Sequence, residues 1–243
     1  MFAVQTKGLV KKYKTKTAVS GLDLAVNEGE IYALLGVNGA GKTTTIRMLT
    51  CLSKPTDGEC WVCGKNCVSE MSDVKSLTGI SPQDTAVAEK LTVRENLELI
   101  CGIYEYNKEK TRESVEKMIE LFGLEGYKNA SAKTLSGGWK RKLSIAMAMI
   151  GEPKVLFLDE PTLGLDVLAR RELWHVVESL KGKITIILTT HYMEEAEQLS
   201  DRIGIMINGV LKAEGTLSEL ETLAGEQGLE NVFVKIAEKE GVR

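Results

Sequence analysis

The chain has 243 residues, enough for one large domain or for one domain with an added lobe. Hydrophobic residues make up 43% and charged residues 27%, so we expect a substantial core and an otherwise ordinary soluble composition. The 31 basic residues are balanced by 34 acidic ones, and the net charge of -3 argues against a general nucleic-acid grip. No nucleic-acid partner is therefore expected, although a local basic patch would be compatible with this balance.

The chain lacks the sequence features that carry a protein into or across a membrane. No run approaches 18 uninterrupted apolar residues, and Met1 to Lys14 carry charges without an apolar signal core. We therefore expect a protein that stays in the cytosol. If it serves a membrane process, other chains must supply the membrane part.

The first 30 residues have the pattern of short alternating strands, with turns expected at Gly21 and at Glu28-Gly29. They predict an antiparallel β region that leans on the core. An apolar segment, 31–35, follows and is typical of a buried parallel strand. A helix is expected to start at Lys42 and to reach Thr50.

The five cysteines are an odd number, which argues against a complete disulfide framework. Cys60, Cys63 and Cys67 leave a metal site open as an alternative. However, residues 58–64 have the pattern of a strand that ends in a turn, and a fourth ligand at a convincing spacing is missing. We favour the strand.

Between about Asp84 and Ile150 the apolar residues recur near the helical period. Two helices are expected there, and their repeating positions are Leu91, Val93, Leu97, Ile100 and Tyr104 in the first and Val115, Met118, Ile119 and Phe122 in the second. The segment separates two expected strands of the core. It therefore predicts an inserted helical lobe that can move relative to the core.

Three further strands are expected, at 155–158, 184–188 and 202–207. Asn208-Gly209 is a strong turn signal, and 210–212 would return as a hairpin partner. Strands that alternate with helices predict an α/β fold with a mainly parallel sheet. We expect one domain over 1–243, with a core and β subdomain at about 1–83 and 151–220, a helical subdomain at about 84–150 and a C-terminal extension at about 221–243.

Residues 36–43 match the phosphate-binding pattern G-x-x-x-x-G-K-[ST], with a strand expected before them and a helix after them. Glycines permit the tight backbone that points N–H groups at phosphate oxygens. Lys42 would supply a positive charge for the β- and γ-phosphates, and the Thr43 hydroxyl suits Mg²⁺. The nucleotide-binding residues expected here are Gly36, Val37, Asn38, Gly39, Ala40, Gly41, Lys42, Thr43 and Thr44.

Two further segments carry chemistry in the second half of the chain. Asp159 ends an apolar strand, which would place its carboxylate beside the phosphate-binding loop, where it can hold Mg²⁺. Ser136-Gly137-Gly138 precedes a helical run, with Ser136 as a possible N-cap and glycines that let backbone approach a phosphate. A monomer does not need two phosphate-binding helix ends for one nucleotide.

These motifs, in this order, resemble the ATP-binding subunit of an ABC transporter from about Tyr13 to about Leu220. The resemblance implies a P-loop NTPase (RecA-like) core with an antiparallel β subdomain and an inserted α-helical subdomain. It implies that Glu160 is the catalytic carboxylate, that His191 contacts the γ-phosphate and that Gln83 senses Mg²⁺ and the attacking water. It also places Tyr13 under the adenine ring and Asp166 at a subunit contact.

The family resemblance further implies that Ser136, Gly137 and Gly138 serve the ATP of a second subunit, so that two subunits enclose two nucleotides head to tail. Trp139 departs from the family, which most often has Gln at that position. The expected cofactors are ATP and Mg²⁺. The expected partners are a second copy or a paralogous ATPase subunit and a membrane-spanning permease, with the protein peripheral on the cytoplasmic side of the cell membrane.

The segment 189–197 looks most like exporter subunits of the ABC-2, drug and sodium-efflux type. One alternative is a soluble ABC ATPase that acts on nucleic acid or ribosomes, but such proteins usually carry tandem cassettes or a long coiled-coil insertion. A second alternative is a non-hydrolysing adaptor, against which Glu160 and His191 argue. The transported substrate is not encoded in these motifs.

Overall fold

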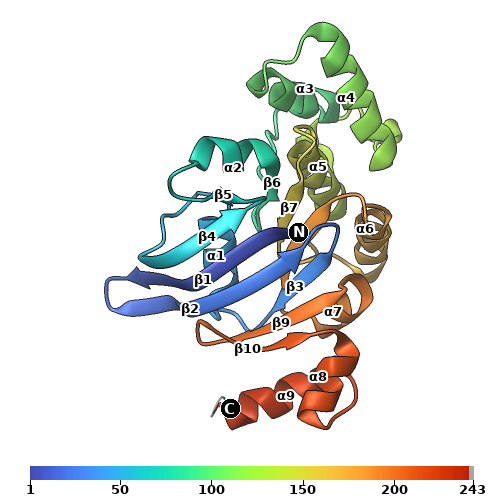
Figure 1. Ribbon diagram of the computed structural model, residues 1–243. Coiled ribbons are helices and arrows are strands. Elements are labelled where there is room, and N and C mark those ends of the chain that lie inside the picture. Colours follow the sequence, from blue (N-terminus) through green and yellow to red (C-terminus); the bar gives the residue numbers. More distant parts are fainter. Residues whose placement is uncertain (241–243) are drawn as a thin grey trace.

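Two β-sheets and a set of covering helices form the body of the protein, and the computed structural model describes residues 1–240 (Figure 1). The larger sheet has six strands in the order β10-β9-β3-β8-β7-β6. Its strands are β3 (Ile31–Leu35), β6 (Thr78–Ser81), β7 (Val155–Asp159), β8 (Thr185–Thr190), β9 (Arg202–Ile207) and β10 (Val210–Gly215). All neighbours in this sheet are parallel except β9 and β10, which form the expected hairpin. The expected α/β fold with a mainly parallel sheet is confirmed.

The smaller sheet is antiparallel and has the order β2-β1-β4-β5. Its strands are β1 (Phe2–Tyr13), β2 (Lys16–Asn27), β4 (Asp57–Val62) and β5 (Lys65–Asn66). The expected turn at Gly21 is wrong. Gly21 lies inside β2 with φ of 67°, next to a register shift against β1, so it forms a bulge rather than a chain reversal. The reversal lies at Lys14 and Thr15 instead.

Helices cover the large sheet and extend from it at two ends (Figure 1). They are α1 (Lys42–Leu49), α2 (Met71–Leu77), α3 (Val93–Ile103), α4 (Lys108–Leu121), α5 (Gly137–Met149), α6 (Val167–Ser179), α7 (Met193–Leu199), α8 (Leu217–Ala224) and α9 (Leu229–Lys239). Short 3-10 turns occur at Glu125–Tyr127 and Ala132–Thr134. Within residues 1–240, each helix is too short or too polar to span a bilayer.

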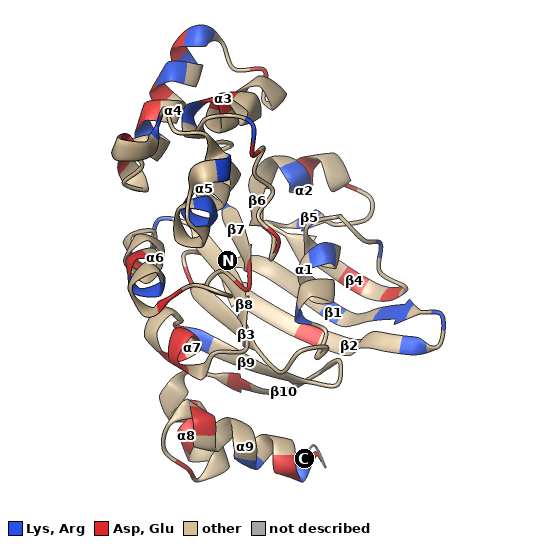
Figure 2. Ribbon diagram, turned by 180° about the vertical axis from the view of Figure 1, so that it is seen from behind, with Lys and Arg blue, Asp and Glu red and all other residues tan. Residues whose placement is uncertain are grey.

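Alternation along the strands explains the layers. Ile31, Ala33 and Leu35 of β3 belong to the core beneath the helices, whereas Tyr32 and Leu34 belong to the core shared with α1 and the antiparallel sheet. Successive side chains of a strand point to opposite faces, so a strand covered on both faces must be apolar throughout. Figure 2 shows β3 and β8 without charged residues, whereas α4 carries both signs.

Local signals define the helices α3 and α4. Thr92 and Glu95 form a capping box, in which the Thr92 hydroxyl accepts from Glu95 N at 3.2 Å and the Glu95 carboxylate accepts from Thr92 N at 2.7 Å. Asn107 caps α4 by accepting from Lys110 N at 2.9 Å. Leu91, expected inside the first helix, therefore precedes it.

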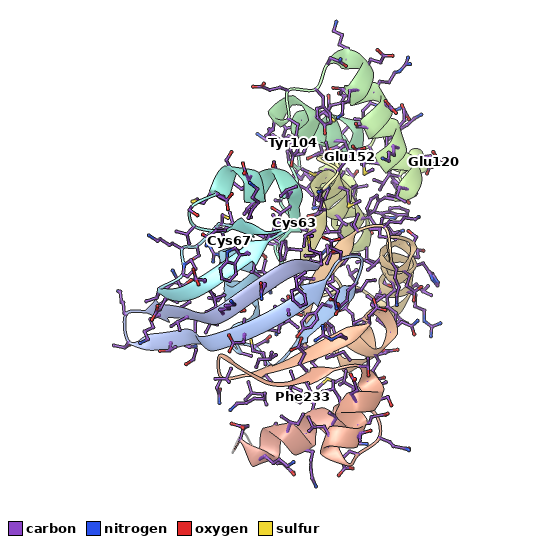
Figure 3. All side chains as sticks on the ribbon, in the orientation of Figure 1. Cys63, Cys67, Tyr104, Glu120, Glu152 and Phe233 are labelled. Atoms are coloured by element: carbon purple, nitrogen blue, oxygen red, sulfur yellow. The ribbon has the colours of Figure 1, made fainter. Side chains whose placement is uncertain are left out.

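The C-terminal helices α8 and α9 lie beside β10, away from α3 and α4 (Figure 1). Phe233, labelled in Figure 3, is buried and joins the core beneath the large sheet. The apolar face of α9 is therefore part of the same core as α6 and α7.

Candidate functional site

The phosphate-binding pattern forms the loop between β3 and α1. β3 ends at Leu35 and α1 begins at Lys42, as the motif requires. Gly41 has φ of 107°, and a Cβ added there would lie 2.4 Å from the carbonyl oxygen of Ala18. Only glycine fits this position, because both the backbone conformation and the contact with β2 exclude a side chain.

Three charged or ionisable side chains meet at the carboxyl edge of the large sheet. Lys42 Nζ lies 3.0 Å from Glu160 Oε1, and His191 Nδ1 lies 2.7 Å from Glu160 Oε2. Lys42 also donates to the carbonyl oxygen of Gly36 at 2.6 Å. Lys42 and Glu160 are 5% exposed, so this pair is shielded from solvent. Glu160 has φ of 48°, a left-handed conformation that is rare for a residue with a side chain and that directs its carboxylate at this cluster.

Asp159 is held by two hydroxyl groups. Thr43 Oγ1 donates to Asp159 Oδ1 at 3.0 Å, and Thr189 Oγ1 donates to the same oxygen at 2.6 Å. Thr189 also accepts from the backbone N–H of Glu160 at 3.1 Å. The register explains this arrangement, because Asp159 of β7 pairs with Thr189 of β8. The sequence reasoning missed Thr189, whose residue type carries no functional signal on a buried strand.

A cavity of about 480 Å³ lies over this edge. Its lining combines residues expected from the sequence with three that were not, and consists of Tyr13, Lys16, Ala18, Asn38, Gly39, Ala40, Gly41, Lys42, Thr43, Thr44, Gln83, Glu160, Leu163 and His191. Lys16, Ala18 and Leu163 are the unexpected members. A larger hollow of about 760 Å³ lies at the opposite ends of β7 and β8, where Lys154 and Thr185 line it, and it contains none of the chemistry described above.

Gly36, Val37 and Asp159 lie behind the lining of the 480 Å³ cavity. Gly36 and Val37 present their carbonyl oxygens to Lys42 Nζ, at 2.6 and 3.4 Å. Asp159 is 4% exposed and reaches the loop through Thr43. The structure therefore brings the whole phosphate-binding loop, both carboxylates, Gln83, Tyr13 and His191 to one place.

The segment Ser136-Gly137-Gly138 does not line that cavity. Ser136 caps α5, with Trp139 N donating to its hydroxyl at 3.5 Å. A Cβ added at Gly138 would lie 2.9 Å from Ala169 Cβ, so this helix end packs on the start of α6. Asp166 caps α6 by accepting from Leu168 N and Ala169 N at 3.0 and 2.9 Å. The N-terminus of α5, which has the glycines of a phosphate-binding helix end, therefore lies outside the cavity at the N-terminus of α1.

Trp139, which departs from the family pattern, and the cysteines at 60, 63 and 67 both lie in well-defined environments. The Trp139 ring lies 4.4 Å from the Tyr127 ring, and Lys142 Nζ lies 4.3 Å from its centroid. Cys60 lies in β4 and its carbonyl oxygen accepts from Cys67 N at 2.9 Å, whereas Cys63 lies in the turn after β4. In the part of the chain that the structure describes, His, Cys, Asp and Glu residues form no group of three or more arranged to hold a metal ion.

Glu195 is a buried carboxyl behind the site. It is 0% exposed, and its Oε1 accepts from Trp174 Nε1 at 3.3 Å. Burial raises the pKa of Glu195, and the hydrogen bond from Trp174 opposes the rise. Within residues 1–240, Glu195 Oε2 and the Thr162 hydroxyl have no hydrogen-bond partner.

A phosphate-binding loop between a parallel strand and a helix, with an aspartate and a glutamate at the end of a second parallel strand of the same sheet, defines a P-loop nucleoside triphosphatase. Residues 19–163 match the family described as ABC transporter, and the chain belongs to that family. It is accordingly an ABC ATPase of the ATP-binding subunit type.

Known relatives agree with this assignment. The chain is 42% identical over 228 residues to the daunorubicin/doxorubicin resistance ATP-binding protein DrrA of Streptomyces peucetius, covering 93% of this chain and 69% of that one. A solved ATP-binding subunit of an ABC transporter superposes with a TM-score of 0.86 at 29% identity, over 97% of this chain and 99% of the other. A dimeric ATP-binding cassette in a post-hydrolysis state, bound to ADP and Pi, superposes with a TM-score of 0.79 at 26% identity, over 88% and 98%.

Proposed function

We propose that this protein hydrolyses MgATP as one half of a head-to-tail dimer and thereby drives a membrane exporter from the cytoplasmic side. The observation that carries the proposal is the division of phosphate-binding elements. The cavity at Lys42 holds one complete set, whereas Ser136 is exposed and lies outside it at the N-terminal end of α5. A second subunit would give that helix end a nucleotide to bind. The similar ATP-binding cassette whose post-hydrolysis structure is dimeric supports a dimer here.

The residues at the cavity fit Mg²⁺. Thr43 and Asp159 present a hydroxyl and a carboxylate oxygen, and Gln83 adds an amide from the cavity wall. Hard oxygen donors of this kind are those that Mg²⁺ takes, usually with several waters and with substrate phosphates. When bound, Mg²⁺ would neutralise negative charge on the phosphates.

The Lys42–Glu160 ion pair supports a specific role for each partner. The phosphates of ATP carry more negative charge than one carboxylate, so they compete for Lys42 Nζ. A Lys42 that turns to the phosphates leaves Glu160 Oε1 without its partner, while Oε2 keeps the contact with His191. Glu160 is then able to orient and polarise the attacking water, and His191 lies beside it to contact the γ-phosphate. Tyr13, at the cavity edge, offers a ring to the adenine base.

Glu160→Gln tests the site and the dimer together. The amide preserves the shape of the side chain but loses the charge that polarises water, so hydrolysis should fall by about 10²- to 10⁴-fold. ATP binding should remain, and the ATP-bound dimer should persist because it is no longer undone by hydrolysis. Size-exclusion chromatography with MgATP measures this directly. A variant that stays monomeric with ATP, or that turns over at the parent rate, would contradict the proposal.

The permease contact is proposed to lie beside Gln83. A groove of about 250 Å³ borders this segment, and its lining includes Pro82, Ala86, Ile103 and Tyr104. Ile103 is 69% exposed, although it is a large apolar residue. Val87 is a second candidate apolar contact in this segment, but it is partly buried against the hydrophobic core, and packing within the lobe is an alternative role for it.

Cross-linking tests the permease contact. Cysteines placed at positions 86 to 90 should cross-link to the membrane protein that co-purifies from detergent-solubilised membranes. Ile103→Glu should uncouple transport and leave most of the basal ATPase activity, because Ile103 does not belong to the lining of the 480 Å³ cavity. If another face of the protein cross-links while these positions never do, the placement is wrong. Absence of any membrane protein in the purified complex would favour a soluble ABC ATPase instead.

A further inference from the structure

Arg141 joins α5 to the segment that carries Gln83. Its guanidinium donates from Nη1 to the carbonyl oxygen of Pro82 and from Nη2 to that of Gln83, each at 2.6 Å. The residue is 4% exposed. Because the guanidinium is planar and its two donors are fixed relative to each other, two bonds to consecutive carbonyls set both the distance and the orientation of the backbone at Gln83.

A second contact ties the same pair of elements. Ser144, one turn further along α5, shares a hydrogen bond of 2.9 Å with Ser81, and both residues are buried. The segment 81–83 is thus held at three successive residues by one face of one helix. α5 is also packed on its apolar side, where Leu143, Ile145 and Ala146 are fully buried.

The surroundings of Arg141 favour a charged guanidinium. Burial lowers the pKa of Arg141, and the carboxylates of Asp159, Glu195 and Asp84 oppose that effect. The ordinary value for arginine is so high that the group stays protonated. A positive charge is therefore held against the carbonyl oxygens of Pro82 and Gln83.

Arg141 links two segments, α5 and residues 81–83, that would contact different nucleotides in the dimer proposed above. The inference rests on that dimer. Gln83 lines the cavity of its own subunit, whereas Ser136 caps the start of α5, which in the proposed dimer would face the partner's nucleotide. We propose that Arg141 is a positioning residue that makes the signature helix and the Gln83 segment move as one unit, so that occupancy of one ATP site sets Gln83 in the other. Arg141 is then the route by which the two sites of the dimer act cooperatively.

The test compares Arg141→Lys and Arg141→Ala with Lys140→Ala. Lys140 is the adjacent residue of α5 and forms a charged contact of comparable length, 2.7 Å, but with the exposed side chain of Glu89 rather than with the Gln83 backbone. ATPase rates are measured over a range of ATP concentrations at saturating Mg²⁺, with the co-purified complex. The parent should show a Hill coefficient approaching about 2, the number of sites. Both Arg141 variants should approach about 1, with the maximal rate reduced about 10-fold, within the range of ordinary coupling.

Three further measurements separate a positioning role from a merely structural one. Binding of a fluorescent ATP analogue to Arg141→Lys should change less than about 3-fold, since Lys42 and the loop are untouched, and a coupling loss falls on cooperativity instead. Its melting temperature should stay near that of the parent. Arg141→Gln, which retains an amide for one of the two carbonyls, should show an intermediate Hill coefficient and serves as the variant of choice if Arg141→Ala does not fold.

Several results would overturn the assignment. Arg141→Lys with the cooperativity and rate of the parent would do so, as would a Lys140→Ala variant that loses as much as Arg141→Lys. A parent enzyme with a Hill coefficient of 1 would also do so, provided that Glu160→Gln dimerises with MgATP. If Glu160→Gln fails to dimerise, the dimer itself is wrong, and the two failures are thereby distinguished.

Discussion

Thr189→Val isolates the hydroxyl that holds both acidic residues of the site. Thr189 is 0% exposed, donates to Asp159 Oδ1 at 2.6 Å and accepts from Glu160 N at 3.1 Å. Valine has nearly the same shape and removes only the hydroxyl. Asp159 then keeps only Thr43, and the N–H of Glu160 keeps only the carbonyl of Thr189, at 3.1 Å.

The magnitude follows from the kind of bond lost. A hydrogen bond to a charged group contributes about 1.5–3 kcal/mol, and its loss is felt in full where the carboxylate is buried. For a chain of this size, that corresponds to a melting temperature lower by roughly 3–12 °C. Loss of a group that orients a metal ligand typically weakens metal binding or activity by about 10- to 100-fold.

Two assays and one control make this prediction sharp. Thermal unfolding without nucleotide gives the stability change, and ATPase activity titrated with Mg²⁺ should show half-saturation shifted upward by about 10- to 100-fold. Thr189→Ser keeps the hydroxyl and loses a buried methyl group, so it should lose about 1 kcal/mol of stability but keep the Mg²⁺ dependence of the parent. A Thr189→Val protein with the Mg²⁺ requirement of the parent would show that this hydroxyl does not orient Asp159.

Three other substitutions test separate parts of the structure. Lys42→Ala should abolish ATP binding, which a filter-binding assay measures. It should also lower the free energy of unfolding without nucleotide by about 3 kcal/mol in urea, because Glu160 loses its buried partner. Hydrolysis at nearly the parent rate would refute the assignment of the phosphate-binding loop. Phe122→Ala should cost about 3–5 kcal/mol in urea unfolding, because this fully buried ring fills the core beneath α4, and an unchanged midpoint would refute that packing. Burial raises the pKa of Glu195 above its unfolded value, so the stability that protonated Glu195 contributes declines as pH rises from about 4.5 through the folded value. Glu195→Gln should therefore gain stability relative to the parent between pH 5 and pH 8, and an equal difference at the two pH values in urea unfolding would contradict this sign.

Much of the fold could be predicted because its signals are local. The buried strands 31–35 and 155–158 are apolar throughout, and the Asn208-Gly209 turn specifies its own hairpin. Gly21 misled the prediction because a glycine at positive φ serves a bulge as readily as a turn. Nothing in the residue types at Lys14 and Thr15 marks the true reversal, which is fixed by the pairing of two long strands.

The candidate site was predictable where a motif specifies a loop and unpredictable where strands meet. Lys16 and Ala18 line the cavity because β2 passes beneath Gly41, a tertiary contact between residues with no local signal. Thr189 reaches Asp159 only through the register of β7 and β8. Arg141 follows the same rule, since its two carbonyl partners lie 58 and 59 residues away along the chain.

The contact of Arg141 with Pro82 and Gln83 joins the two connections between the helical insertion and the core. The chain leaves the core after Pro82 and Gln83, forms α3 and α4, and returns through α5, which carries Arg141. A lobe joined to a core by two connections can turn freely only if those connections can slide past each other. The Arg141 fork prevents such sliding, because it fixes the departing strand to the returning helix. Motion of the lobe must then displace Gln83 and the start of α5 together, so a permease that presses on the lobe acts on both ATP sites of the proposed dimer at once.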